Sequence, residues 1–173
     1  MSVLVCEYLL VLALLIVSSN TEECTAPLPQ TDITLQQVTG VWFFAERHTP
    51  QTVPTNTSVC QDLFVSQNGF FITLKSFAFD EFEVEVIAEE PWKWKVPGRD
   101  HATWVIYFAP DDGVLVVASC VGSSDYHSYI ILSRRLPLTE LQLEDAHYVI
   151  GAAGVKTSKE FNWWNSTAEC TQD

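Results

Sequence analysis

Short apolar runs separated by turn-forming residues dominate the chain. All eight prolines and most of the seven glycines fall between apolar runs instead of inside them, which is typical of many short strands and not of helices. Asn68-Gly69 and Asp112-Gly113 are the strongest hairpin signals, because both central residues of a type I′ turn need positive φ. The pattern predicts eight consecutive antiparallel strands, at residues 40–47, 60–66, 69–77, 79–87, 92–96, 102–109, 114–121 and 127–134.

The clearest alternation lies in residues 81–96. Apolar side chains alternate with glutamates over 82–86 and with lysines over 92–96, which predicts an antiparallel hairpin that turns near Glu89. One register places Glu85 opposite Lys93 and Glu83 opposite Lys95, so that charges match on one face and apolar groups on the other. The charged row is expected to face solvent, where each exposed pair contributes at most about 1 kcal/mol.

The hydrophobic period changes from two to that of a helix after Pro137. A capping box at Thr139 and Gln142 is followed by apolar residues at helical spacing up to Gly154. A short extended piece, 159–164, then precedes Cys170, and its two tryptophans are expected to pack against the first strand. The predicted fold class is therefore all-β, an eight-stranded antiparallel up-and-down barrel with one C-terminal α-helix packed outside. Eight strands can close a sheet and enclose one small ligand.

The N-terminus has the features of a secretory signal peptide. An apolar block over residues 9–17 ends at Ser18 and Ser19 and is too short to span a bilayer. The residues before it include Glu7 and neither Lys nor Arg, so an uncleaved anchor or a buried N-terminal helix is the alternative. The prediction is a signal peptide over residues 1–19, a single domain over residues 20–173 and secretion.

The mature chain would keep an even number of cysteines, which predicts two disulfides in an oxidising compartment. These are Cys24, Cys60, Cys120 and Cys170. Zinc is the alternative for any four-cysteine set, but zinc sites usually contain close Cys pairs and this chain has none. The four histidines lack the spacing of a metal pair and are expected at the surface or in loops. Sequons at Asn56 and Asn165 predict N-glycosylation.

Composition and charge remove several classes of function. The chain has 22 acidic against 9 basic side chains and a net charge of -13. Nucleic-acid binding depends on Lys and Arg neutralising phosphates, so this balance argues against a nucleic-acid partner. The aromatic content of 12% argues against disorder. The sequence also contains no recognisable nucleophile-elbow motif for a Ser, His and Asp set.

Two motifs carry a family resemblance. Gly40-Val41-Trp42 at the start of the first strand, and Ile131-Leu132-Ser133-Arg134 at the end of the eighth, followed by a helix, resemble the first and third motifs of the lipocalins. The order of the cysteines relative to the strands is similar to that of apolipoprotein D and of the arthropod bilin-binding, insecticyanin and crustacyanin-like lipocalins. The resemblance implies the pairs Cys24 with Cys120 and Cys60 with Cys170.

A physical argument gives these motifs a structural role. Trp42 is expected to close the base of the barrel, and Arg134 can stack its planar guanidinium on the indole while it donates to nearby carbonyls. Gly40, Trp42 and Arg134 are therefore predicted to stabilise the barrel and not to contact a ligand.

Alternation of side chains along the strands assigns the interior. The residues predicted to contact a ligand there are Phe44, Phe82, Val84, Trp92, Trp94, Trp104, Ile106, Phe108, Leu115, Val117, Ser119, Ser128 and Ile130. The resemblance assigns those of the sixth and seventh strands, from Trp104 to Ser119. Glu46, Val86 and Leu132 have the same inward parity. Trp94, Trp104 and Phe82 are the strongest candidates; ordinary core filling is the alternative for each aromatic residue.

Such a lining suits a flat or elongated apolar molecule with few polar groups. The resemblance implies a secreted protein that binds and transports a small hydrophobic ligand of the bilin, carotenoid, retinoid, sterol or fatty acid class. It implies no catalytic residue, no metal and no required cofactor beyond a bound chromophore or lipid. One alternative is an extracellular interaction protein or oligomeric pigment protein that acts through its loops, such as 49–58. The other is a ligand-transforming enzyme, whose known route in this family needs a free cavity thiol. Nothing in the sequence supports a membrane or receptor contact.

Overall fold

The computed structural model describes residues 24–51, 60, 62–68, 71–76, 82–98, 102–122 and 124–171, with the side chains of 71–76 and 82–84 left out. The predicted signal peptide, residues 1–19, and the sequon at Asn56 lie outside the described residues. Within those ranges, no helix has the length and apolar character needed to cross a membrane.

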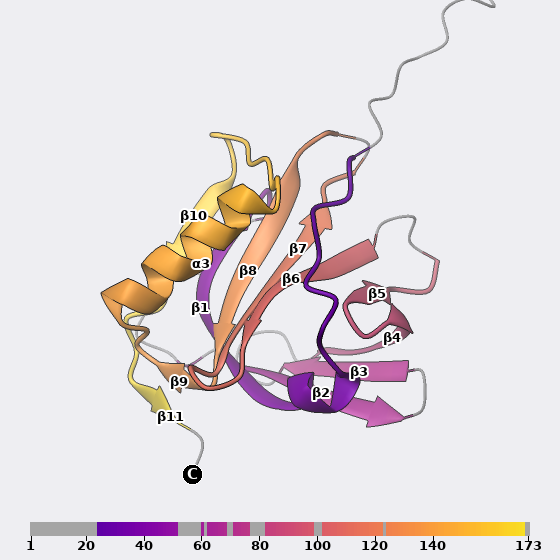
Figure 1. The fold of residues 1–173 in the computed structure, drawn as a ribbon, viewed down its shortest axis with the longest axis horizontal. Helices are drawn as coiled ribbons and strands as arrows, with labels where there is room; N and C mark the ends of the chain where they lie inside the picture. Colours follow the sequence, from indigo (N-terminus) through magenta and orange to yellow (C-terminus); the bar gives the residue numbers. More distant parts are fainter. Residues whose placement is uncertain are drawn as a thin grey trace, which may run out of the picture.

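Eight strands follow one another up and down a single antiparallel sheet (Figure 1). Their bounds are β1 (Gly40–Thr49), β2 (Asp62–Asn68), β3 (Phe71–Ser76), β4 (Phe82–Glu90), β5 (Lys93–Lys95), β6 (Ala102–Ala109), β7 (Val114–Cys120) and β8 (His127–Ser133). The sheet closes into a barrel because β1 pairs with β2 on one edge and with β8 on the other. The predicted strand order and fold class are confirmed.

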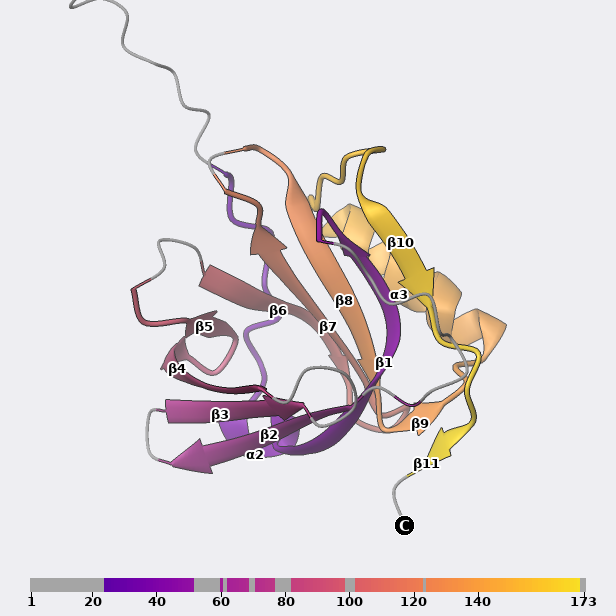
Figure 2. The same ribbon diagram turned by 180° about the vertical axis from the view of Figure 1, so that it is seen from behind.

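A ninth strand, β10 (Asn162–Asn165), extends the sheet along β1 (Figure 2). It pairs with the second half of β1, whereas β2 pairs only with the first half. Trp164 of this strand is 4% exposed and Trp163 is 59% exposed. One tryptophan therefore packs into the protein, as predicted, and the other faces solvent.

The helix α3 (Glu140–Ala152) lies across the outside of the sheet (Figure 1). Thr139 is its N-cap: the Gln142 N–H donates to Thr139 Oγ1 at 3.3 Å, and Gln142 Oε1 accepts from the Thr139 N–H at 3.0 Å. The predicted capping box and helix are confirmed. The smaller elements are α2 (Leu35–Val38), β9 (Arg135–Leu136) and β11 (Cys170–Thr171), and the last two pair with each other.

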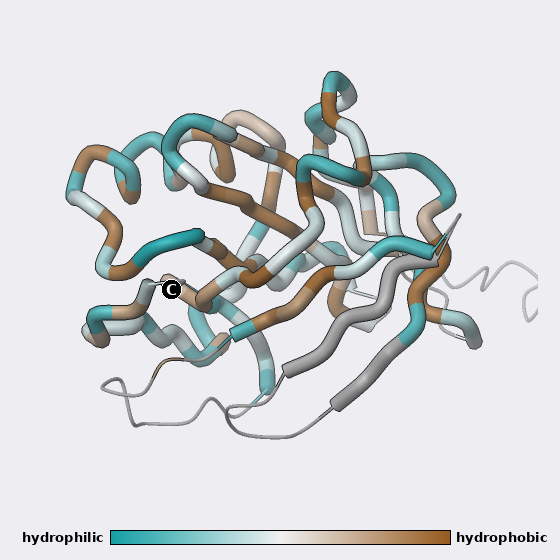
Figure 3. The backbone as a smooth tube through the Cα atoms, turned by 90° about the horizontal axis from the view of Figure 1, so that it is seen from below, coloured by the Kyte–Doolittle hydropathy of each residue, from teal (hydrophilic) through white to brown (hydrophobic). Residues whose placement is uncertain are grey.

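Buried apolar side chains form two clusters, one on each face of the sheet. The interior cluster includes Trp42, Trp94 and Leu115, and the outer cluster lies between the sheet and α3, where Ala146 and Ile150 are buried. Figure 3 shows apolar stretches concentrated in the strands and polar stretches at many of the turns. The strands are therefore covered on both faces near α3, and alternation alone does not separate the interior from the outer cluster.

The register predicted for the hairpin over residues 81–96 is wrong. Ile87 pairs with Lys95 and Glu90 with Lys93, with a bulge between Ala88 and Glu90. The chain turns at Pro91, so β4 ends three residues later than predicted, and Glu83 and Glu85 pair with β3 and not with β5. Charge matching was a weak guide here because exposed ion pairs contribute little, whereas proline removes a donor from the ladder and favours a turn.

The predicted turn type at Asp112-Gly113 is also wrong, although the hairpin itself forms. Among the described residues only glycines have positive φ, so Asp112 does not have the conformation that a type I′ turn requires. Instead β6 and β7 are joined through residues 110–113, where the Gly113 N–H donates to the Pro110 carbonyl at 3.3 Å.

The closed end of the barrel is built on Trp42 and Arg134. Trp42 is fully buried, and its indole N–H donates to the Val38 carbonyl at 2.8 Å. The Arg134 guanidinium carbon lies 3.6 Å from the centroid of the Trp42 ring. Its nitrogens donate to the carbonyls of Val41 at 2.8 Å and Thr39 at 2.6 Å. The predicted stacking of the guanidinium on the indole is confirmed.

Both disulfides have the predicted pairing. Cys24 is bonded to Cys120 and Cys60 to Cys170. The first bond ties the segment before β1 to the end of β7, and the second ties the segment before β2 to β11. Because the two loops closed in this way are long, the chain-entropy model assigns each bond a stabilisation of about 4 kcal/mol or more.

We predict that Gly40→Ala destabilises the protein more than Gly98→Ala does. Both glycines have positive φ, at 104° and 75°, so each substitution carries a backbone cost of about 1–2 kcal/mol. A Cβ at Gly40 would lie 2.8 Å from Arg134 Nη1, whereas one at Gly98 would meet no atom within 4 Å. Urea unfolding is expected to give a larger loss for Gly40→Ala by at least about 1 kcal/mol. Equal losses would contradict this account of the closed end.

Candidate ligand-binding cavity

A cavity of about 170 Å³ lies inside the barrel, next to the closed end. Its lining begins at Phe44, two residues after Trp42 on β1, and includes Leu132, two residues before Arg134 on β8. The described residues that line it are Phe44, Arg47, Leu63, Val86, Trp94, Val96, Thr103, Val117, Ser119, Ser128, Ile130 and Leu132. Most of these side chains are apolar, and two are aromatic.

Six of the predicted contact residues meet in this cavity: Phe44, Trp94, Val117, Ser119, Ser128 and Ile130. Phe108 and Leu115 also belong to the interior cluster, but they pack below the cavity. The Phe108 ring meets that of Trp42 edge-on, with centroids 6.3 Å apart. These two residues therefore fill the base of the barrel.

Trp104 and Ile106, in contrast, point away from the cavity, so their predicted inward orientation is wrong. Both belong to the outer cluster. The pairing of β6 with β7 shifts between Val105 and Tyr107, so that Ile106 is an extra residue in the ladder. Such a bulge reverses the facing of the residues on one side of it. Phe108 therefore faces the interior as predicted, and Val105 replaces Trp104 and Ile106 there.

The segment before β1 contacts β6 at this bulge. The Gln30 side chain accepts from the Phe108 N–H at 2.6 Å and donates to the Phe108 carbonyl at 3.3 Å. The Gln30 backbone N–H donates to the Val105 carbonyl at 3.0 Å. Gln30 thus satisfies backbone groups of β6 that a neighbouring strand would otherwise pair.

A second bulge, in β1, exchanges the facing of Glu46 and Arg47. Phe44 pairs with Leu132 and Glu46 with Ile131, so Ala45 is the extra residue. Glu46, expected inside, lies on the outer face, and Arg47 lines the cavity. The neighbouring residues give no glycine or proline signal for this bulge, which explains why alternation missed Arg47.

The remaining predicted residues lie elsewhere. Trp92 is in the turn between β4 and β5, half-buried against both clusters. Phe82 and Val84 are outside the residues whose side chains the structure describes. Leu63, Val96 and Thr103 were not predicted. Val96 continues the alternation of Trp94. Leu63 belongs to a run of consecutive apolar residues, so alternation does not indicate which of them face the interior.

Three hydroxyl groups form a polar row across the wall. The register places Thr103 opposite Ser119 and Ser119 opposite Ser128 on three adjacent strands. The hydroxyls of Thr103 and Ser119 are 2.7 Å apart and hydrogen-bonded. The row lies at the end of β8 farthest from Arg134. It gives a ligand neutral donors and acceptors on the side of the cavity away from the closed base.

Arg47 is the charged residue among the described lining residues. Its guanidinium carbon lies 4.3 Å from the centroid of the Phe44 ring. The side chain is half-buried, and this burial lowers the pKa of Arg47 from its usual value. An arginine nonetheless keeps its charge at neutral pH. The cavity therefore combines apolar walls with a single cation.

A separate polar cluster lies on the outer face beneath α3. The buried Glu46 carboxylate accepts from Tyr129 Oη at 2.7 Å and lies 2.9 Å from His147 Nε2 of α3. Burial, then the hydrogen bond to Glu46 and its charge, raise the pKa of Tyr129 above its usual value. The carboxylate thus joins β1, β8 and the helix.

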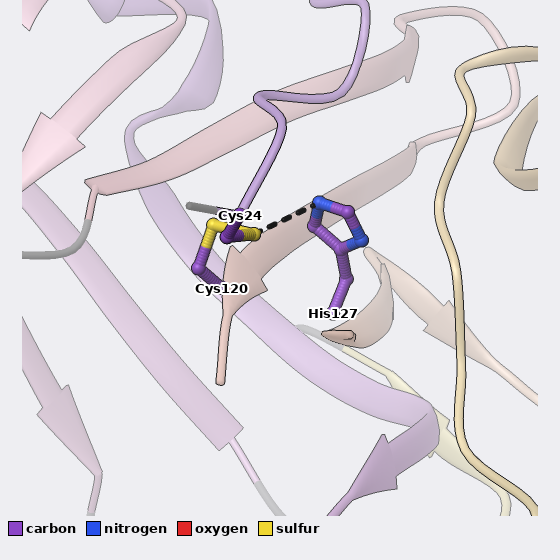
Figure 4. Close-up of side chains that lie close together, drawn as sticks. All are labelled: Cys24, Cys120 and His127. Atoms are coloured by element: carbon purple, nitrogen blue, oxygen red, sulfur yellow. Dashed lines mark hydrogen bonds between the residues drawn. A yellow bond between two sulfur atoms is a disulfide. The ribbon is translucent and has the colours of Figure 1, made fainter. Parts of the chain in front are cut away.

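His127 is fully buried, contrary to its expected surface position. It lies beside the disulfide of Cys24 and Cys120 (Figure 4). Its Nε2 lies 2.8 Å from the Thr25 carbonyl and 3.3 Å from Cys24 Sγ, and its Nδ1 accepts from the Lys156 N–H. A neutral ring with the proton on Nε2 satisfies the two backbone groups. The ligand atoms of Cys24, Cys120 and His127 lie within 4.8 Å of one another. The sulfurs are joined as a disulfide, however, and metals bind thiolates.

Comparison with solved structures identifies the fold. The cockroach allergen Per a 4 superposes with a TM-score of 0.61 at 12% identity, covering 84% of this chain and 96% of that one. Lobster apocrustacyanin A1 gives a TM-score of 0.57 at 14% identity, with coverage of 86% and 91%. Apocrustacyanin C2 gives 0.51 at 14% identity, with coverage of 83% and 92%. No protein-family model and no curated protein matches the sequence.

These neighbours are lipocalins. The chain described here has the lipocalin fold, as its Gly40-Val41-Trp42 motif, its Arg134 and its cysteine order predicted. Its neighbours include the arthropod group that the cysteine pattern resembles.

We predict that Tyr129→Phe lowers the free energy of unfolding by about 1–3 kcal/mol, because it removes a donor from a buried carboxylate. Tyr107→Phe is the matched control, since the Tyr107 hydroxyl makes no hydrogen bond to the described residues and the side chain packs at the same outer cluster. Urea unfolding followed by circular dichroism measures both. A loss for Tyr129→Phe no larger than that for the control would contradict the role given to Glu46.

Proposed function

We propose that this protein is a secreted lipocalin that binds and carries a small hydrophobic molecule in its barrel cavity. The observation that carries the proposal is the cavity itself, with apolar walls, two aromatic rings and a few polar groups. Most small-molecule sites share this combination, in which apolar area gives affinity and a few polar groups fix orientation. Bilin, carotenoid, retinoid, sterol and fatty acid are the candidate ligand classes.

The size of the cavity limits what apolar contact alone can achieve. At about 170 Å³ it is smaller than the roughly 300–1,000 Å³ typical of drug-sized ligands. Burial of about 300 Å² of apolar ligand surface contributes about 7 kcal/mol, and association costs at least about 4 kcal/mol. The remaining 3 kcal/mol or so corresponds to a Kd above about 1 mM. Useful affinity therefore needs ring contacts with Phe44 and Trp94 and at least one strong polar contact.

Secretion is supported by three features. Residues 9–17 form the apolar block of a signal peptide. Two disulfides are typical of proteins that fold in an oxidising compartment. The Asn165 sequon is exposed at the end of β10, where a glycan can be attached without disturbing the core.

The test is a titration of tryptophan fluorescence with biliverdin, a carotenoid, retinol, cholesterol and decanoic acid. Trp94 is anchored in the cavity wall by a hydrogen bond from its indole N–H to the Pro91 carbonyl at 2.9 Å. A bound ligand is expected to change its emission, and Trp94→Phe should remove most of that change. Trp163→Phe is the matched control, because Trp163 is exposed on β10, and it should keep the change.

A protein whose emission responds to none of the five ligand classes would contradict the carrier proposal. A response that survives in Trp94→Phe but disappears in Trp163→Phe would place binding on the outer surface instead. That result would favour the alternative of an interaction protein.

The enzymatic alternative depends on a free cavity thiol. The four cysteines among the described residues are all in disulfides, and Cys6 belongs to the predicted signal peptide. We therefore infer that the mature protein binds its ligand without transforming it through a cysteine.

Thiol titration checks this inference. Mature protein that is denatured without reductant should react with no thiol reagent, and the same sample after reduction should show four thiols per chain. A free thiol in the unreduced sample would contradict the inference and revive the enzymatic alternative.

A further inference from the structure

Arg47 is a cation in the wall of an apolar cavity. Its guanidinium lies over the Phe44 ring, and its side chain forms no hydrogen bond or ion pair with the residues that the structure describes. Within the same ranges, no acidic side chain lines the cavity. The acidic neighbour in sequence, Glu46, is on the opposite face of the sheet, where it is bound to Tyr129 and His147.

Placing a guanidinium in an apolar wall carries a free-energy cost. Partly burying a charge removes hydration, and proteins normally compensate with a counter-ion and hydrogen bonds. A contact with the face of a phenylalanine recovers only about 1 kcal/mol or less at a partly exposed site. A guanidinium has five N–H donors in a planar arrangement that matches a carboxylate, so the chemical group that complements Arg47 is an anion.

Trp164 supplies a second, independent observation. It pairs with Arg47 across β1 and β10 and belongs to the interior cluster, on the same side of the sheet. Its indole N–H is buried and has no hydrogen-bond acceptor among the described residues. Buried tryptophan N–H groups normally have a partner. Two neighbouring strands therefore each present, on the interior side, a donor that no described residue accepts from.

We propose that Arg47 is a ligand-binding residue that pairs with the carboxylate of an amphipathic ligand, a hydrophobic acid of the medium-chain or long-chain type. The proposal rests on the carrier function proposed above and narrows it to anionic ligands. It supplies the strong polar contact that the small cavity requires for affinity.

The order of residues along β1 orients this ligand. Trp42 closes the base, Phe44 lines the lower wall, and Arg47 follows after the bulge at Ala45. The apolar chain lies toward Trp42, with its carboxylate at Arg47. The hydroxyl row of Thr103, Ser119 and Ser128 begins on β8, the strand that pairs with β1 at Arg47, and offers neutral polar contacts near the same end of the cavity. Entry is therefore tail first.

The test compares decanoic acid with 1-decanol, which has the same chain length and no charge, at neutral pH and by isothermal titration calorimetry. Wild-type protein is expected to bind the acid about 10- to 100-fold more tightly than the alcohol, as one charge-assisted hydrogen-bonded pair gives. Arg47→Met keeps an unbranched side chain and removes the charge. It should abolish this preference while it leaves the affinity for 1-decanol within about two-fold.

Two further variants serve as controls. Arg135→Met removes an exposed arginine of β9 and should keep the full preference for the acid. Arg47→Lys keeps the charge but loses the planar guanidinium that can donate two hydrogen bonds to one carboxylate. It should retain part of the preference for the acid over the alcohol. Urea unfolding of ligand-free Arg47→Met should show a stability equal to or higher than that of the wild type, because a buried charge without a partner is removed.

The outcomes separate the two proposals. Equal affinity of the wild type for acid and alcohol, or a preference that survives in Arg47→Met, would overturn the anion site and leave the carrier function standing. Loss of binding of both probes in Arg47→Met at unchanged stability would show that Arg47 shapes the cavity and does not bind an anion. Failure of the wild type to bind either probe would overturn the anion site, and the carrier function would then depend on the other four ligand classes of the fluorescence titration.

Discussion

The stack of Arg134 on Trp42 is the contact on which the barrel depends. Trp42 stands near the start of the first strand and Arg134 directly follows the eighth, so one pair of side chains joins the two strands that must meet for the sheet to close. The same guanidinium donates to carbonyls on either side of the first strand's start. Gly40 and Gly113 are glycines where a Cβ would lie within 3 Å of Arg134. One side chain therefore constrains Gly40 and Trp42 on the first strand and Gly113 just before the seventh.

The sequence predicts the positions of the strands and the helix better than it predicts which face of the sheet each side chain lies on. Turn residues between apolar runs located all eight strands, and the capping box at Thr139 located the start of α3. The predicted inward orientation of Trp104 and Ile106 is wrong because a bulge adds one residue to β6. Strict alternation of side chains holds only where no residue is added. Bulges follow from how a closed sheet must bend, which depends on all of its strands, whereas hairpin signals are local.

The bulge at Ala45 has an effect on the chemistry of the cavity. In a regular β1, alternation from Phe44 would put a carboxylate inside the barrel and a guanidinium outside. The extra residue exchanges them, so that Glu46 finds two donors beneath the helix and Arg47 enters the cavity. A single inserted residue therefore decides the sign of the charge inside this barrel, in a chain whose overall charge is strongly negative.

The carboxylate of Glu46 also bears on how α3 is held. The helix buries Ala146 and Ile150 and packs the partly buried Leu143 against the outer cluster, which is a narrow apolar stripe for its thirteen residues. The Glu46 carboxylate on β1 accepts a hydrogen bond from Tyr129 and lies 2.9 Å from His147 of the helix. The contact with His147 forms only when that face of the helix is turned toward β1. The His147 side chain is about half exposed, so its contact with Glu46 adds little to overall stability but ties the helix to the sheet at one position. Glu46 thus helps to set how α3 is rotated about its axis against the sheet.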